Sequence, residues 1–237
     1  MDYSISPDGK KYPLPKKGDY TKEFERLRKI AAAQKKKGNE IVVVMGLGFV
    51  GAVMAAVVAD STDKKAGKPK KFVIGMQRPS PRSYWKTPML NSGVSPVKAE
   101  DPEVDILIRR CVLERKNLIA TYTYDALSLA DVVVDVQCDF LKAELGNCTT
   151  GRAEIAALEE SIKIIAGKIQ PSCLVLIETT VPPGTTEYIA YPIMKRAFTG
   201  RGIASEPLLA HSYERVMPGR DYVKSIRDFW RVCSGIN

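Results

Sequence analysis

The first residues with a recognisable chemistry are the glycines of GLGFVG at 46–51, which form the pattern G-x-G-x-x-G. A β-branched run, IVVVM at 41–45, precedes them, and an apolar stretch, FVGAVMAAVVAD at 49–60, follows. A strand, a glycine turn and a helix in this order can cradle a dinucleotide pyrophosphate on the free N–H groups of the helix. Glycines that only allow close packing are the alternative, but the flanking patterns favour a cradle. The expected cofactor contacts are Gly46, Gly48, Phe49, Val50 and Gly51.

Such a site normally has an acid at the end of its second strand, where the carboxylate binds the adenosine ribose. The second strand is predicted at 71–76, KFVIGM, and the residues that follow are Gln77 and Arg78. An amide can hydrogen-bond the ribose, but it has no charge to repel a 2′-phosphate, which an arginine could bind. NAD and NADP both stay open on these residues. The simpler alternative is that Gln77 and Arg78 open a polar loop.

Strand and helix patterns alternate along the rest of the chain, which favours a doubly wound α/β fold: a mostly parallel, Rossmann-like sheet with helices on both faces. Strands are predicted at 41–45, 71–76, 118–123, 131–137, 173–179 and 207–213, with one more within 228–236. Helices are predicted at 21–38, capped by Thr21, and at 49–60, 103–117, 152–169 and 184–198. Residues 1–19 are expected to be an arm or loop. The predicted units are a basic arm and helix at 1–40 and a dinucleotide-binding domain at 41–237.

Composition narrows the class of protein. The 237 residues are 45% apolar and 27% charged, as in globular proteins, and the N-terminus lacks the apolar core of a secretory signal. The five cysteines are scattered, as in a reduced cytoplasmic protein, and His211 is the only histidine, so no metal site is expected. No apolar stretch reaches the roughly 18 residues of a membrane span without interruption by glycine and polar flanks, so no membrane association is expected. The net charge of +9 allows nucleic-acid binding, but the basic runs lack interleaved aromatics. We therefore expect no specific nucleic-acid partner.

Two further motifs stand downstream, ETTVPPGTT at 178–186 and YERVMPG at 213–219. Together with the glycine motif, in this order and spacing, they resemble the UDP-glucose/GDP-mannose dehydrogenase family. The ERV-x-PG form is most similar to the UDP-N-acetylhexosamine branch. The resemblance extends from about Ile41 to Asn237.

The resemblance implies oxidation of a sugar C6 alcohol to a carboxylate in two hydride transfers to NAD, through an aldehyde and a cysteine thioester. It implies that Thr180 lies beside the nicotinamide and positions the reacting oxygen or water. It also implies that Glu214 acts as a general base, and a carboxylate can take the proton of an attacking water. Without the family, Thr180 could simply begin the Pro-Pro-Gly turn, and Glu214 could be a surface ion-pair partner.

The sequence departs from the family pattern in three places. Gln77 stands where an acid is usual, Val136-Gln137-Cys138 replaces a Val-Pro-Thr-like turn, and Tyr213 stands where proline is commoner. Val136, Gln137 and Cys138 remain the expected cofactor contacts of that turn.

The nucleophilic cysteine, the catalytic lysine and most sugar-binding residues of the family come after the point where this sequence ends. We therefore expect the chain to bind NAD, with a UDP-sugar site that is incomplete, and the full-length protein to be a cytoplasmic homodimer. The alternative is a non-catalytic dinucleotide-binding module or a truncated paralogue with a preference for NADP.

Overall fold

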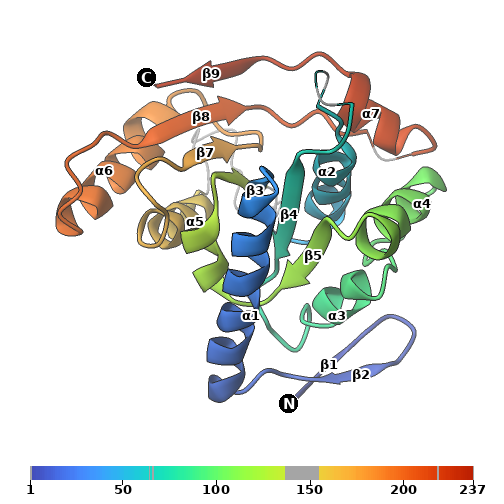
Figure 1. Ribbon diagram of the computed structural model, residues 1–237. Helices are drawn as coiled ribbons and strands as arrows, with labels where there is room; N and C mark the ends of the chain where they lie inside the picture. Colours follow the sequence, from blue (N-terminus) through green and yellow to red (C-terminus); the bar gives the residue numbers. More distant parts are fainter. Residues whose placement is uncertain (1, 64, 66, 137–154, 218, 237) are drawn as a thin grey trace, which may run out of the picture.

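The fold is that of a computed structural model, which describes residues 2–63, 65, 67–136, 155–217 and 219–236. Within these residues a seven-stranded sheet has the order β5-β4-β3-β6-β7-β8-β9 (Figure 1). Six strands run parallel and β9 runs antiparallel to β8. The strands are β3 (Glu40–Met45), β4 (Lys71–Met76), β5 (Leu118–Thr121), β6 (Val132–Asp135), β7 (Leu174–Ile177), β8 (Leu208–Ser212) and β9 (Cys233–Gly235). The chain winds outward from β3 first to one side and then to the other, which confirms the predicted doubly wound fold.

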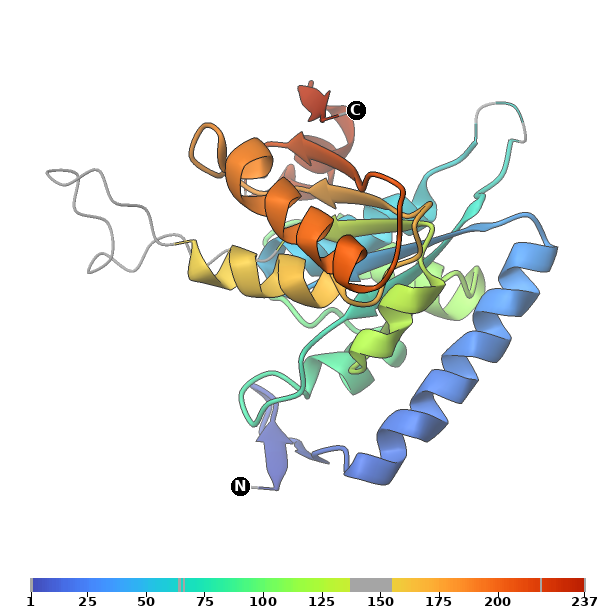
Figure 2. The same cartoon turned by 90° about the vertical axis from the view of Figure 1, so that its left-hand side faces the viewer.

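Helices cover both faces of the sheet (Figure 2). One layer holds α1 (Lys17–Lys36), the 3-10 helix η2 (Tyr124–Leu129), α5 (Ala156–Ala166), the π-helical turn η3 (Thr185–Ala190) and α6 (Tyr191–Gly200). The other holds α2 (Phe49–Asp60), α3 (Lys86–Asn91), α4 (Glu103–Arg109), the π-helical turn η1 (Arg110–Glu114) and α7 (Tyr222–Asp228). Among the described residues, no helix combines the length and the apolar character needed to span a bilayer.

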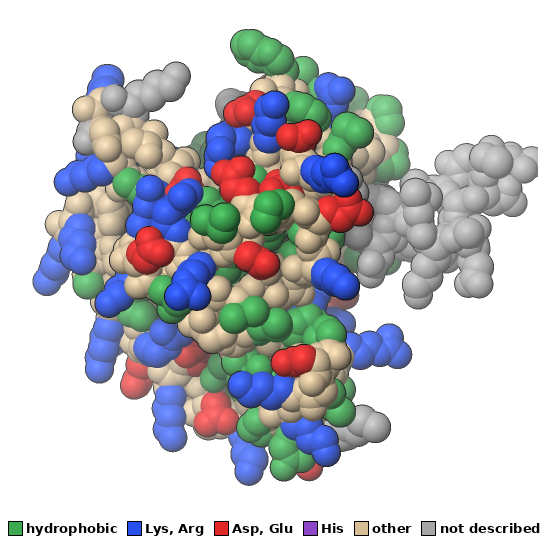
Figure 3. Space-filling model, turned by 90° about the vertical axis from the view of Figure 1, so that its right-hand side faces the viewer, with side chains coloured by type: hydrophobic (Ala, Val, Ile, Leu, Met, Phe, Trp, Pro, Cys, Tyr) green, Lys and Arg blue, Asp and Glu red, His purple; other side chains and the backbone are tan. Residues whose placement is uncertain are grey.

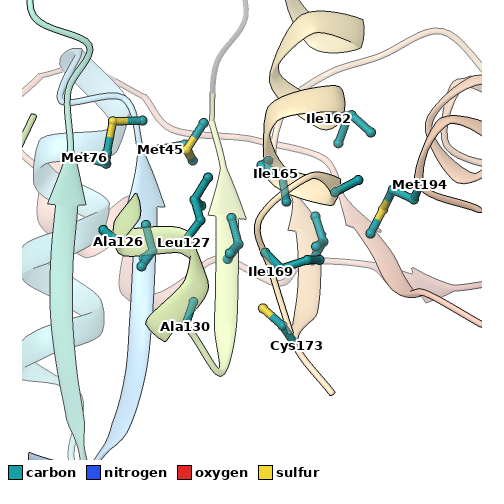
Figure 4. Packing of buried hydrophobic residues seen from close by; sticks show 14 of the residues in the cluster. Met45, Met76, Ala126, Leu127, Ala130, Ile162, Ile165, Ile169, Cys173 and Met194 are labelled. Carbon is teal, nitrogen blue, oxygen red and sulfur yellow. The ribbon is translucent and has the colours of Figure 1, made fainter. Parts of the chain in front are cut away.

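Strand β3 lies between these two layers. Its alternate side chains enter different apolar clusters: Val43 and Met45 pack toward α1 and α5, and Val44 packs toward α2. Figure 4 shows part of the first cluster, where Met45 lies near Leu127 of η2. Because both faces are buried, the strand needs a continuous apolar run, which is the pattern that predicted it.

The prediction of an arm at 1–19 and of a helix capped by Thr21 was wrong. Two short strands, β1 (Tyr3–Ile5) and β2 (Lys11–Pro13), form an antiparallel hairpin, and α1 begins at Lys17. The carboxylate of Asp19 accepts the backbone N–H of Lys16 at 2.8 Å, so the N-cap of the helix is Lys16 and not Thr21. The strands of the hairpin have three residues each, too few to show a period in the sequence.

Charged side chains are spread over the surface. On the face shown in Figure 3, lysine and arginine side chains are distributed widely, with aspartate and glutamate side chains among them. This is the pattern of a solvated charged surface.

The strand predicted within 228–236 is confirmed as β9 at 233–235, and the helix α7 before it was not predicted. Asp101 connects α7 to α4: its carboxylate accepts the backbone N–H of Glu103 at 2.8 Å and that of Val223 at 2.9 Å. The Asp101 side chain is buried, and the two helix starts that it joins are far apart in the sequence. A pattern confined to one segment could not reveal this connection.

We expect Asp101→Ala to lower the free energy of unfolding by about 2 kcal/mol, because two backbone donors lose a charged acceptor. Urea denaturation followed by circular dichroism measures this loss. The control is Asp105→Ala, which removes an exposed carboxylate of the same helix and should change the value by less than about 0.5 kcal/mol. Equal losses in the two variants would contradict the role assigned to Asp101.

Candidate nucleotide-binding site

The turn between β3 and α2 brings two backbone segments unusually close together. A Cβ atom at Gly51 would lie 1.8 Å from the carbonyl oxygen of Gly46, so only glycine fits there. Gly46 itself has a φ of 93°, in the left-handed region, and its N–H donates to the carbonyl of Met76 at 2.8 Å. Gly48, by contrast, faces open space: a Cβ there would meet no atom within 4 Å. The turn therefore leaves room for a ligand against the backbone where α2 begins.

A cavity of about 530 Å³ lies over this turn. Its floor is formed by the glycine motif and Val136. One wall comes from the loop after β4, and another comes from a single face of α5 with the spacing i, i+3, i+4, i+7. The residues of the α5 wall are Ala157, Glu160, Ser161 and Ile164, and those of the loop wall are Gln77, Arg78 and Lys86, with Tyr124 of η2 nearby. The free N–H groups and the positive end of the α2 dipole make the floor suitable for an anion such as a pyrophosphate.

Gln77 is tied to the glycine turn. Its side-chain oxygen accepts the backbone N–H of Leu47 at 2.9 Å, so the amide holds the loop after β4 against the turn. Arg78 follows on the same loop, Lys86 begins α3 at the end of that loop, and both line the cavity. Burial lowers the pKa of Lys86, because a desolvated ammonium is less stable than a solvated one. The polar character of this wall therefore comes from one amide and two cations.

The first turn of α2 is supported from behind by Tyr222 of α7. The ring of Tyr222 stacks on that of Phe49, with centroids 4.8 Å apart and planes inclined by 13°. The hydroxyl of Tyr222 donates to the carbonyl oxygen of Phe49, and its side chain is fully buried. Burial raises the pKa of Tyr222, with a smaller contribution from the Glu214 carboxylate. The phenol therefore stays a neutral donor at physiological pH.

A second buried contact supports the α5 wall. Asp135, at the end of β6, is fully buried, and its carboxylate accepts the hydroxyl of Ser161. Ser161 itself lines the cavity. This hydrogen bond joins the central sheet to the helix face that closes the site.

Sequence reasoning missed the cavity residues Ala157 and Ile164 and four that carry polar groups, Lys86, Tyr124, Glu160 and Ser161. The amphipathic spacing of α5 was visible, and its polar face offered a signal for the last two. Lys86 had no such signal, because the short helix α3 that it begins was not predicted.

The structure brings together the predicted contacts of the glycine motif with Gln77, Arg78 and Val136, whereas Thr180 and Glu214 lie outside the cavity lining. Gln137 and Cys138 lie outside the described residues. Thr180 follows β7 and its side chain is exposed, and Glu214 follows β8 and accepts the N–H of Val216. Because β7 and β8 are parallel neighbours of the central strands, both residues lie at the carboxyl edge of the sheet, as does the glycine turn.

The cysteines of the described part do not form part of this site. Cys111 and Cys173 are buried, and burial raises their pKa values to about 11 and about 12. Cys233 is exposed on β9. Within the described residues no thiol lines the cavity, and the two buried thiols stay protonated and unreactive near neutral pH.

Comparison with known proteins agrees with this geometry. The sequence model of the UDP-glucose/GDP-mannose dehydrogenase family, NAD binding domain, matches residues 40–232. A UDP-N-acetyl-D-mannosamine dehydrogenase of Pyrococcus horikoshii is 27% identical over 197 residues, which are 83% of this chain and 41% of that protein. The crystal structure of an NDP-N-acetyl-D-galactosaminuronic acid dehydrogenase from Methanosarcina mazei Go1 superposes with a TM-score of 0.72 at 31% identity, over 90% of this chain and 41% of that one. The chain therefore spans about 41% of the length of these relatives.

The two glycines Gly48 and Gly51 are predicted to differ in what an added methyl group changes: ligand binding at the first and stability at the second. Gly48→Ala should leave the melting temperature nearly unchanged, since its Cβ meets no protein atom, yet weaken NADH binding at least about tenfold by occupying the space beside the pyrophosphate. Gly51→Ala should lower the free energy of unfolding by about 3 kcal/mol, because the helix must move away from the turn.

Gly200→Ala, at the end of α6, is the matched control, because it also adds a methyl group in open space. It should change neither property. Thermal melting and NADH fluorescence titration measure the three variants. Unchanged NADH affinity in Gly48→Ala would show that the pyrophosphate does not approach this turn.

Proposed function

The chain belongs to the UDP-glucose/GDP-mannose dehydrogenase family, whose NAD-binding domain it forms, and on this premise we propose that it is the cofactor-binding part of an NAD-dependent nucleotide-sugar 6-dehydrogenase. The observation that carries the proposal is the cavity over the glycine turn, open at Gly48 and closed to any side chain at Gly51. The proposed substrate is a UDP-N-acetylhexosamine, oxidised at its C6 alcohol to the uronate. The names of the relatives, which act on N-acetylated nucleotide sugars, support this substrate class.

We propose residues 41–237 as the dinucleotide-binding domain and residues 1–40 as an addition to it. The start of the family match at residue 40 supports this boundary. The addition folds against the domain, because Leu27 and Ala31 of α1 are buried in the same cluster as β3.

The residues of the cavity have separate tasks in this proposal. The backbone N–H groups at the start of α2 bind the pyrophosphate, while Phe49 and Val50 shape the floor beneath it. Gln77 and Arg78 lie at the end of β4, where the adenosine ribose is held in this fold. NAD, when bound, accepts a hydride from the sugar carbon. Val136 lines the path from the turn toward the later strands, and Gln137 and Cys138 are proposed to continue it.

We propose Thr180 and Glu214 as the groups that handle the reacting oxygen. Their position supports this: each follows the carboxyl end of a parallel strand, at the edge of the sheet that carries the cradle. The Thr180 hydroxyl would hold the substrate oxygen or a water. The Glu214 carboxylate, oriented by the N–H of Val216, would take the proton that this oxygen releases.

The second oxidation of an aldehyde to an acid needs a thiolate in this family. In the described part of the chain, Cys111 and Cys173 are buried with raised pKa values and Cys233 lies away from the cavity. We therefore propose that this chain binds the cofactor without completing the reaction, and that the enzyme to which it contributes the cofactor site acts as a cytoplasmic homodimer on the UDP-sugar.

One observation favours a second candidate, a dinucleotide-binding module that also accepts NADP. The Gln77 amide oxygen is already bound to Leu47, and the remaining polar groups on that wall are the cations Arg78 and Lys86. A wall without a carboxylate does not repel a 2′-phosphate.

Titration of the purified chain with NADH and NADPH tests the proposal. We expect NADH to bind with a micromolar Kd and NADPH to bind more weakly. Nicotinamide fluorescence and calorimetry measure both Kd values. Tighter binding of NADPH would favour the second candidate. Absence of binding by both would overturn the assignment of the cavity.

The incompleteness of the reaction has its own test. Incubation of the chain with NAD and UDP-N-acetylmannosamine or UDP-N-acetylglucosamine should produce no NADH above the rate without enzyme, measured by absorbance. NADH formation that exceeds the protein concentration would contradict the proposal, because it would require groups that the described cavity does not contain.

A further inference from the structure

The N-terminal segment lies outside the family match, yet it contacts Trp85, the neighbour in sequence of the cavity residue Lys86. The match begins at residue 40, whereas the hairpin β1–β2 and helix α1 occupy residues 3–36. Figure 1 shows the hairpin beside α3, whose first residue, Lys86, lines the cavity. The segment is therefore placed where it can shape the wall formed by the loop after β4.

Ser4 of the hairpin makes the most direct contact with that loop. Its hydroxyl oxygen accepts the backbone N–H of Trp85 at 3.1 Å. The Ser4 side chain is fully buried, and that of Trp85 is 9% exposed. The indole N–H of Trp85 donates to the carbonyl of Arg82 at 3.0 Å. Both the ring N–H and the backbone N–H of Trp85 are therefore hydrogen-bonded. Trp85 is thus held in one position between the hairpin and its own loop.

Helix α1 fixes the neighbouring end of β5. The ring of Tyr122 packs edge-on against Tyr20 of α1 and against Tyr84 of the loop, with centroid distances of 5.3 and 5.6 Å. The hydroxyl of Tyr122 donates to the carbonyl of Asp19, and the hydroxyl of Thr121 donates to the carboxylate of Glu23 at 2.8 Å. Burial raises the pKa of Tyr122 to about 12, so it remains a donor across the physiological range. These contacts hold the loop from a second side.

The loop held in this way carries two cations. Lys86 and Arg78 both line the cavity, and the Lys86 ammonium lies 5.9 Å from the centre of the Trp85 ring, within range of a cation–π contact. In the described part of the chain, the ion pairs of lysine and arginine involve other residues, and neither Lys86 nor Arg78 forms one. The acidic residue of the lining, Glu160, comes from a different element, α5. Two cations without a protein counter-ion at the ribose end of a nucleotide cavity suit a phosphate group.

We propose that the N-terminal hairpin is part of the nucleotide site: Ser4 fixes Trp85, and Trp85 places the Lys86 ammonium where it binds a phosphate of the dinucleotide. Ser4 and Trp85 are positioning residues, and Lys86 is the binding residue. The inference rests on the proposed function, because it requires that the cavity hold a dinucleotide.

Ser4→Ala removes the acceptor of the Trp85 N–H, and Ser95→Ala is its matched control. Ser95 is also buried, and its hydroxyl oxygen accepts a backbone N–H, that of Val97, at 3.2 Å. Calorimetry with ADP-ribose should show a Kd raised about fivefold in Ser4→Ala and unchanged in Ser95→Ala. Ser4→Thr, which keeps the hydroxyl, should restore the affinity.

A double-mutant cycle between Ser4 and Lys86 separates an effect of Ser4 on the position of Lys86 from an effect of Ser4 on the stability of the fold. Lys86→Met should raise the Kd for ADP-ribose about tenfold, and adding Ser4→Ala should have no further effect, because the group that Ser4 positions is gone. Trp85→Phe is a second variant that leaves the backbone hydrogen bond to Ser4, removes the indole N–H bond to the carbonyl of Arg82 and weakens the ring contact with Lys86; it should raise the Kd about twofold. Thermal melting confirms that each variant is folded.

The outcomes are distinct. If Lys86→Met weakens ADP-ribose and its 2′-phosphorylated form equally, the phosphate is the pyrophosphate; if only the 2′-phosphorylated form is weakened, it is the 2′-phosphate. Wild-type affinity of Ser4→Ala for both ADP-ribose and its 2′-phosphorylated form, or a full Ser4→Ala effect in the Lys86→Met background, would overturn the inference while the proposed function stands. A wild-type chain that binds no ADP-ribose and no NADH would overturn the proposed function and this inference with it.

Discussion

The nucleotide site depends on the contact between the backbones of Gly51 and Gly46. Because no side chain fits between them, helix α2 begins directly against the turn that ends β3. The N–H groups of the first helical turn then face the cavity at short range, and the dipole of the helix adds to their attraction for an anion. A wider separation would move these donors away from the position that a pyrophosphate takes beside Gly48. The geometry of the site therefore follows from the gap between these two backbones, which is too small to hold a methyl group.

Residues distant in the sequence keep this contact in place. Tyr222 stacks on Phe49 and donates to its carbonyl, Gln77 accepts the N–H of Leu47, and Asp101 ties the start of α7 to α4. Gln77 and Asp101 accept backbone N–H groups of a turn and of two helix starts, and Tyr222 adds a donor to the carbonyl at the start of α2. The cradle is therefore a property of several elements, although its glycines stand within six residues. Its rigidity favours binding, because less conformational freedom is lost when the ligand enters.

Both sides of the cavity are supported in the same manner. Asp135 at the end of β6 holds Ser161 on α5, and the N-terminal hairpin holds Trp85 next to Lys86. In each case a buried polar side chain connects a cavity wall to an element outside it. The sheet sets the positions of the strand ends, and these hydrogen bonds set the positions of the walls around them.

The sequence by itself determined the strand, turn and helix of the cradle and the doubly wound, mostly parallel character of the sheet. The patterns that carry this information are local: a buried strand needs a continuous apolar run, and a close turn needs glycine. Only the tertiary structure decided which elements surround the cradle. The hairpin at 3–13 and the placing of Trp85 next to Lys86 depend on partners distant in the sequence, as in the bond from Trp85 to Ser4, 81 residues apart. Such contacts leave no periodic signal, because each is made by one side chain to a segment whose position is known only once the sheet has brought the two together.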